Sequence, residues 1–166
     1  MTVDVTALRS VLRSHASGVA VLTASGADGQ PVGVTVTSFM SISARPALVS
    51  FALAGTSNTW AVIKDCDWFG VQLLGGHQSE VAQRFATPGV DRFAPPTSWR
   101  PGSHGVPLLD DCLCWLLCCP YHRVKLGDHH LIVGAVEQVE RGVPGDSLVH
   151  LHGILQPVTP VTLART

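Results

Sequence analysis

The stretch Gly33–Phe39 has the residue types that point most directly to chemistry. It alternates Val with Thr and ends in Ser38 and Phe39, a period-two pattern that predicts a strand and its exit. Hydroxyls and free backbone groups at a strand exit can hydrogen-bond the polar edge of a flat heterocycle while the aromatic closes one side. The same pattern is also typical of a half-buried strand whose threonines face solvent.

Ser57-Asn58-Thr59 is a second candidate, because it stands where an apolar run predicts the start of a helix. The first-turn N–H groups of a helix are unpaired and lie at its positive end, so they can bind an anion. Plain N-capping by Ser or Thr is the commoner reason for such a pattern.

Two arginines stand beside aromatic residues, in Arg84-Phe85-Ala86 and in Asp91-Arg92-Phe93. Either arginine could clamp a phosphate or stack on a ring. Pairing of Asp91 with Arg92 at the surface is the alternative.

The histidines offer two further patterns. His129, in the predicted turn Gly127–His130, could donate to a carboxamide or carry a proton near neutral pH, or could simply be solvated. His150 and His152 have the spacing of one strand face, but no third ligand completes a zinc set.

The cysteines at 112, 114, 118 and 119 lie in an apolar run without zinc-knuckle spacing, which favours buried reduced thiols. We therefore expect no metal site.

The commonest fingerprints of other enzyme classes are missing from the sequence. There is no G-x-G-x-x-G, no G-x-x-x-x-G-K-[ST], no G-x-S-x-G and no C-x-x-C. A Rossmann dinucleotide site, a P-loop and a serine-hydrolase elbow are thereby disfavoured or excluded.

The elements that must position these residues are mostly strands. Hydrophobic periodicity predicts helices over 4–15, from Ser57 and over Ser79–Ala86, with a long surface loop over 87–107. Strands are expected at 19–23, 32–36, 47–53, 68–74, 108–122, 131–140 and 148–155. This order favours a small β-barrel with peripheral helices, in a single domain over 1–166, above a doubly wound parallel sheet.

Composition narrows the class of protein. The chain has 166 residues, 46% hydrophobic and 14% charged, with a formal net charge of −1. These values exclude a disordered chain, and no basic cluster supports a nucleic-acid partner. The longest wholly apolar run, Cys112–Cys119, is far shorter than the roughly 20 residues that span a bilayer, and no signal peptide is evident. We therefore expect a cytoplasmic protein, whose surplus apolar surface forms a subunit interface.

Taken together, the motifs resemble the flavin reductase domain family with the FMN-binding split barrel, and in particular the small reductase components of two-component flavin monooxygenases. The resemblance covers the chain from about Leu8 to Gly153. The matching pieces follow one another in family order: Ser17–Thr23, Gly33–Ser43, Pro46–Val49, Ser57–Thr59, Arg84–Ala86, Asp91–Phe93, Gly105–Leu109 and Gly127–His129.

This resemblance implies a homodimeric split β-barrel that binds FMN or FAD, and in which NADH or NADPH passes hydride to the flavin. Reduced flavin would diffuse to a partner monooxygenase. The alternatives are a split barrel that only carries or senses flavin or haem, with His150 or His152 as the haem ligand, or an enzyme that retains its flavin to oxidise an organic substrate. Carried onto this chain, the family pattern gives His129 a contact with the nicotinamide, and it gives the flavin contacts to Thr35, Val36, Thr37, Ser38, Phe39, Ser57, Asn58, Thr59, Arg84, Phe85 and Arg92.

Overall fold

Strands dominate the computed structural model, which describes residues 3–159. The helices of this part are α1 (Val5–Leu12), α2 (Asn58–Ile63) and α3 (Ser79–Ala86), with short 3-10 turns at Gly76–Gln78 and Ser103–Gly105. The mostly β architecture with few helices is thus confirmed. The strands are β1 (Ser17–Gly18), β2 (Ala20–Ser25), β3 (Pro31–Val36), β4 (Met40–Ala44), β5 (Ala47–Ala54), β6 (Phe69–Leu73), β7 (Trp99–Pro101), β8 (Pro107–Leu109), β9 (Cys114–Leu126), β10 (His129–Arg141), β11 (Ser147–Leu151) and β12 (Ile154–Val158).

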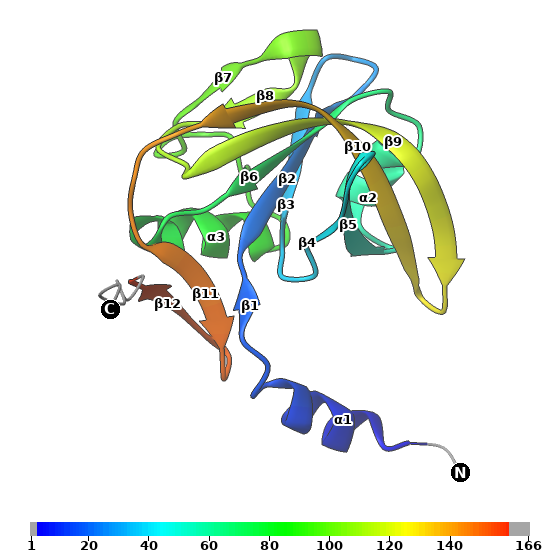
Figure 1. Cartoon of the computed structure of the whole chain (residues 1–166), viewed down its shortest axis with the longest axis vertical. Helices are drawn as coiled ribbons and strands as arrows, with labels where there is room; N and C mark the ends of the chain where they lie inside the picture. The colour runs from blue at the N-terminus through cyan, green and yellow to red at the C-terminus, as the bar shows by residue number, and fades with distance from the viewer. Residues whose placement is uncertain (1–2, 160–166) are drawn as a thin grey trace.

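Seven strands form one antiparallel sheet in the order β3-β2-β6-β9-β10-β5-β4 (Figure 1). The sheet curls enough to bring β3 close to β5, near its other edge. Its inner face buries Leu22, Phe51, Phe69, Val71 and Ile132 in one cluster, in which the rings of Phe51 and Phe69 meet edge to face. This burial of apolar side chains is the main favourable contribution to folding.

A second apolar cluster lies between the sheet and α3. Val21, Leu74, Phe85 and Leu148 are each at most 3% exposed there. The helical spacing of Ala82 and Phe85 turns both side chains inward.

Three predicted strands or loops need correction. The single strand predicted over 148–155 is wrong, because His152 and Gly153 form a left-handed turn that folds β11 back against β12. His150 and His152 therefore do not share a strand face. The strand predicted from Leu108 is interrupted by a turn before β9, and the predicted loop 87–107 contains β7, which pairs with β8.

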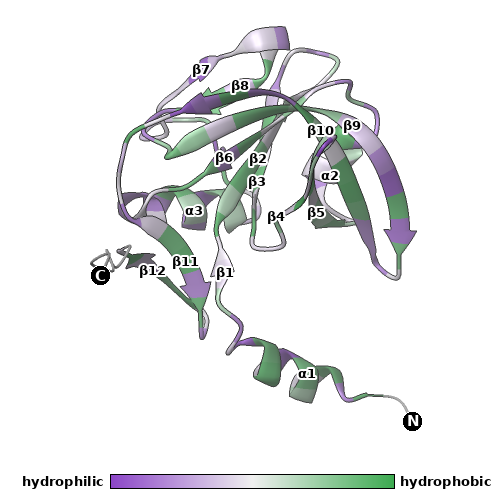
Figure 2. Cartoon of the chain, in the orientation of Figure 1, coloured by the Kyte–Doolittle hydropathy of each residue, from purple (hydrophilic) through white to green (hydrophobic). Residues whose placement is uncertain are grey.

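Helix α1 stands apart from the sheet (Figure 1). Its apolar side chains Val5, Leu8, Val11 and Leu12 are all exposed, from 48% for Leu8 to 73% for Val11. Figure 2 shows this apolar stripe along the helix. Within residues 3–159, none of the helices is long and apolar enough to cross a membrane.

Candidate functional site

A cleft of about 580 Å³ opens between the start of β3, the N-terminus of α2 and the loop that follows α3. Three of its residues carry donors suited to an anion: the Ser57 hydroxyl, the Asn58 amide and the Arg92 guanidinium. The whole lining consists of Pro31, Val32, Gly33, Thr56, Ser57, Asn58, Thr59, Pro88, Gly89, Val90, Asp91, Arg92 and Phe93.

The carbonyl of Gly33 joins the two sides of this cleft. It accepts a hydrogen bond from Thr59 Oγ1 on α2 (3.2 Å) and another from Arg92 Nη1 on the loop. Arg92 Nη2 also donates to the Thr87 carbonyl (3.2 Å). Thr59 is buried and its hydroxyl is used in this contact, whereas Arg92 is only partly buried. Burial lowers the pKa of Arg92, yet a guanidinium keeps its charge at neutral pH.

Gly33 must be glycine because the Phe85 ring lies directly behind it. A Cβ atom built on Gly33 would come within 2.6 Å of Phe85 Cε1. Phe85 is fully buried, so the structure places its ring behind the cleft wall. Thr35, on the same strand, donates its hydroxyl to the Ala82 carbonyl of α3 (2.7 Å) and so faces that helix as well.

The loop after α3 is held in place by its own polar contacts. Asp91 Oδ1 accepts hydrogen bonds from the N–H groups of Phe93 and Ala94, both at 3.1 Å. The carbonyls of Arg92 and Phe93 accept from Thr97 Oγ1 (2.7 Å) and Trp99 Nε1 (3.2 Å). Asp91 therefore shapes a turn that presents Arg92 to the cleft, and no Asp91–Arg92 ion pair is recorded among the described residues.

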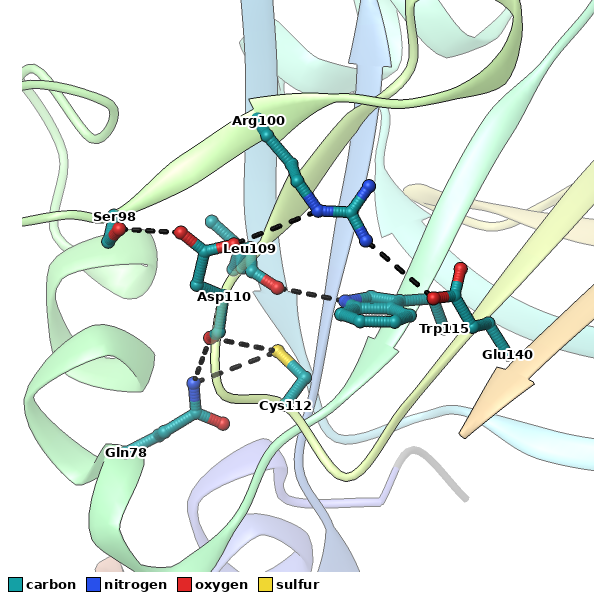
Figure 3. A network of polar contacts seen from close by, with 8 residues as sticks. All are labelled: Gln78, Ser98, Arg100, Leu109, Asp110, Cys112, Trp115 and Glu140. Carbon is teal, nitrogen blue, oxygen red and sulfur yellow. Dashed lines mark hydrogen bonds and ion pairs between the residues drawn. The ribbon is translucent and has the colours of Figure 1, made fainter. Parts of the chain in front are cut away.

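A polar network fixes the hairpin of β7 and β8 that continues this loop (Figure 3). Arg100 lies over the Trp115 ring at 5.0 Å and reaches Asp110 at 4.0 Å and Glu140 at 3.7 Å. Ser98 Oγ donates to Asp110 Oδ2 (2.6 Å). Through these contacts, β9 and β10 support the loop that carries Arg92.

The exit of β3 places its candidate residues in different surroundings. Val36 is buried and Phe39 packs against the same core. Ser38 Oγ bridges to β5, accepting from the Ala52 N–H (2.9 Å) and donating to the Ala52 carbonyl (3.3 Å). Thr37 is exposed and lines a separate cavity beside α1.

His129 begins β10, at the tip of the β9–β10 hairpin. Its Nδ1 lies 2.7 Å from Asp128 Oδ1, and this contact with His129 lowers the pKa of the exposed Asp128 carboxyl. The Asp128 carbonyl accepts a hydrogen bond from the Gly55 N–H (2.9 Å), two residues before the α2 cap Ser57. The structure thus brings His129 beside the loop that enters α2.

Two groups of candidates lie away from the cleft. Arg84 lines a different pocket with Thr87 and Pro96. Cys112 and Cys118 are buried, and this burial raises the pKa of each thiol to about 12. Among the residues described, no group of three His, Cys, Asp or Glu side chains could hold a metal ion.

Sequence reasoning missed the part of the cleft wall formed by Pro31, Val32 and Pro88–Val90. A glycine among β-branched strand residues was the available signal, because it marks a close approach by another group. That signal applied to Gly33, but it did not reveal that Phe85 is the approaching group.

Comparison with known proteins identifies the family of this chain. The protein-family model described as flavin reductase like domain matches residues 12–159. The chain belongs to this family. It is 40% identical over 131 residues to the NADH:FMN oxidoreductase of Rhodococcus qingshengii, which covers 79% of this chain and 68% of the relative. It is 37% identical over 130 residues to the reductase component of the flavin-dependent trigonelline monooxygenase of Acinetobacter baylyi, covering 78% of this chain and 42% of the relative.

A solved structure has a similar fold. The NADH:FAD oxidoreductase SgcE6 of Streptomyces globisporus, in complex with NAD and FAD fragments, superimposes with a TM-score of 0.88 at 28% identity. The match covers 96% of this chain and 95% of that chain. Among the curated relatives, by contrast, the chain spans between 42% and 68% of the length of several that it matches.

Proposed function

We propose that this chain is an NAD(P)H:flavin oxidoreductase, in a single domain, that transfers a hydride from NADH or NADPH to FMN or FAD. The reaction consumes the reduced nicotinamide, the oxidised flavin and one proton, and it yields the oxidised nicotinamide and the two-electron-reduced flavin. When bound, the flavin supplies the hydride acceptor, and the protein supplies binding and orientation. The chain belongs to the flavin reductase family, and within that family the cleft around Arg92 is the observation that best supports this proposal.

The donors of this cleft suit the flavin phosphate. Ser57, Asn58 and Arg92 combine a hydroxyl, an amide and a guanidinium on one lining, and charge-assisted hydrogen bonds to phosphate are strong. Thr59 contributes indirectly, because its hydroxyl donates to the Gly33 carbonyl and so holds the cleft wall rather than the phosphate. Thr35 and Phe85 support the same wall from behind, and the backbone of Val36, Thr37, Ser38 and Phe39 would border the flavin ring.

His129 would hold the nicotinamide carboxamide. Its Nδ1 is oriented by Asp128, which leaves Nε2 free for a ligand. Hydride transfer between two stacked rings needs no protein acid or base, so the role of His129 is to align the donor.

The split barrel and the homodimer belong to the same proposal. The edge strand β3 nears β5, the neighbour of the opposite edge strand β4, and this approach supports an incompletely closed barrel. The exposed stripe on α1, with Met40 and Ile42 on β4, is apolar surface that a second copy would cover. Reduced flavin would then diffuse to a partner monooxygenase, as the name of the Acinetobacter relative suggests.

Oxidation of NADH and NADPH by the purified protein, with and without FMN, FAD or riboflavin, tests the activity. Turnover that requires added flavin is the expected result, and it ranks both specificities. No oxidation with any donor and flavin pair would overturn the proposal and favour a flavin-binding protein without reductase activity.

A further inference from the structure

Helix α2 follows directly on two of the proposed phosphate donors, yet it has only 6 residues. Isolated helices shorter than about 12 residues are marginal in water, so its own hydrogen bonds cannot keep it in place. Contacts with the rest of the chain must therefore fix where Ser57 and Asn58 stand relative to Arg92. These contacts decide the geometry of the cleft.

The hairpin of β9 and β10 contacts α2 at its entrance and in its middle (Figure 1). At the entrance, the Gly55 N–H donates to the Asp128 carbonyl (2.9 Å). In the middle, the Trp60 ring stacks on the His130 ring, with 3.9 Å between the ring centroids and 15° between the planes. Gly55 leaves room for this stack, because a Cβ atom there would lie 3.3 Å from His130 Cε1.

The same hairpin also holds the end of α2, through Arg123 on β9. Arg123 Nη2 donates to the Ile63 carbonyl (3.2 Å) and to the Cys66 carbonyl (3.0 Å). Carbonyls at the C-terminus of a helix have no partner within it, and a positive charge is favourable beside them. Arg123 therefore fixes the end of α2 to the sheet, as His130 fixes its middle.

The stability of the fold alone does not account for an arginine at position 123. Its Nε atom is buried and has no hydrogen-bond partner among the residues described. Within residues 3–159, no carboxylate forms an ion pair with Arg123. A partly buried charge without an opposite charge has a desolvation cost, which an apolar side chain would avoid. What the arginine adds is the pair of bonds that locate α2.

On its other side, α2 contacts the wall of the phosphate cleft. Thr59 Oγ1 donates to the Gly33 carbonyl, which Arg92 Nη1 also contacts. The helix thus lies between the β9–β10 hairpin and the cleft, and a shift of α2 changes how far Ser57 stands from Arg92. The exit of β3, where we place the flavin ring, is not part of α2.

We propose that Arg123 and His130 are positioning residues for the flavin phosphate, and that both act through α2. The inference rests on the proposed function, in which Ser57, Asn58 and Arg92 bind this group. Neither Arg123 nor His130 lines the cleft, so neither contacts the phosphate itself. They set the place from which α2 presents its donors, and they therefore affect binding of the phosphate far more than binding of the ring.

The dissociation constants of FMN and riboflavin test this assignment, because the two ligands differ only in the phosphate. Arg123→Gln should weaken FMN binding about fivefold and change riboflavin binding less than about twofold, since displaced donors form poorer charged hydrogen bonds. Arg123→Lys keeps the charge without the planar fork and should recover part of the FMN affinity. The matched control is Arg141→Gln, an exposed arginine at the far end of β10, which should bind both flavins as the native protein does.

The stacked pair gives a second set of variants. His130→Ala removes the ring that lies on Trp60 and should weaken FMN binding about twofold to threefold. His130→Phe keeps a flat ring on Trp60 and should restore the affinity. Amide hydrogen exchange of the ligand-free proteins gives a further readout: the amides of residues 58–66 should exchange faster in Arg123→Gln than in the native protein, and those of β2 and β3 should not.

A purely structural role for Arg123 gives a different result. Leu148→Ala, in the second apolar cluster, serves as the control for a general loss of stability and should leave the ratio of the two dissociation constants at its native value. An unchanged ratio in Arg123→Gln would overturn the assignment. If Arg123→Gln does not fold, the ratio in His130→Ala against His130→Phe decides by the same criterion.

The failure of the proposed function would look different again. A native protein that binds FMN and riboflavin equally would overturn the phosphate cleft and this assignment together. A native protein that prefers FMN but oxidises neither NADH nor NADPH would refute the reductase activity alone. In that case a lowered FMN preference in Arg123→Gln would still support the positioning role.

Discussion

The backbone N–H of Gly55 donates a 2.9 Å hydrogen bond to the carbonyl of Asp128. This one contact joins two segments far apart in the sequence: the loop that enters α2 and the hairpin that presents His129. It continues the pairing of β5 with β10, in which Ala54 faces His129. Because a sheet ladder sets this alignment, the candidate donor contact and the candidate phosphate cleft lie on one rigid frame.

Replacing His129 by Ala should slow turnover with NADH or NADPH by about tenfold, since it removes the ring that would align the nicotinamide. Flavin affinity should change little, because the Arg92 cleft is intact. Steady-state kinetics and a flavin titration measure the two effects. Asp128→Asn, which removes the orienting carboxylate and keeps the ring, should give a smaller loss. Unchanged kinetics in His129→Ala would exclude the role.

Gly33→Ala should destabilise the protein by about 1–3 kcal/mol, the usual cost of overpacking a filled site. The new Cβ would meet the Phe85 ring, which core packing prevents from moving away. Urea denaturation measures this change, and the double variant Gly33→Ala with Phe85→Leu should recover part of it. If the two losses are simply additive, the Gly33–Phe85 contact is not the cause.

Leu8→Asp should convert a dimer into a monomer, because it places a charge in the apolar stripe of α1. Ser10→Asp places the same charge on the other side of α1, away from the apolar stripe, and should leave the dimer intact. Sedimentation equilibrium of both variants and the native chain distinguishes the two. A native protein that sediments as a monomer would contradict the proposed interface.

The cysteines predict how stability changes at high pH. Burial raises the pKa of Cys112 and Cys118 to about 12, from an ordinary value of 9.0. Between these values the unfolded chain loses thiol protons that the folded chain keeps, so the free energy of unfolding should fall as the pH rises above 9. Cys112→Ala should make this decline shallower, whatever its effect at pH 7. Denaturation at pH 7 to 10.5 measures it, and an equal slope in both proteins would argue against the shift.

Much of the fold could be predicted from local patterns. The span of α3 matches its predicted range, and Ser57 caps α2 by accepting from the Trp60 N–H. The predicted strand over 148–155 failed because the His152–Gly153 turn carries no strong local signal: the residue at its left-handed first position is a histidine. Long-range contacts were equally out of reach. That Thr59 and Arg92 share the Gly33 carbonyl depends on the packing of three separate segments.

The central claim is that the cleft around Arg92 holds the flavin phosphate, and FMN and riboflavin test it most directly because they differ only in that group. Their dissociation constants should be measured for the native protein, for Arg92→Gln and for the control Arg84→Gln, whose side chain lines another pocket. We predict that the native protein and the control bind FMN at least about tenfold more tightly than riboflavin, as charged hydrogen bonds to a phosphate imply. In Arg92→Gln that preference should largely disappear. A native protein that binds FMN and riboflavin equally, or an Arg92→Gln variant that keeps the full preference, would contradict the account.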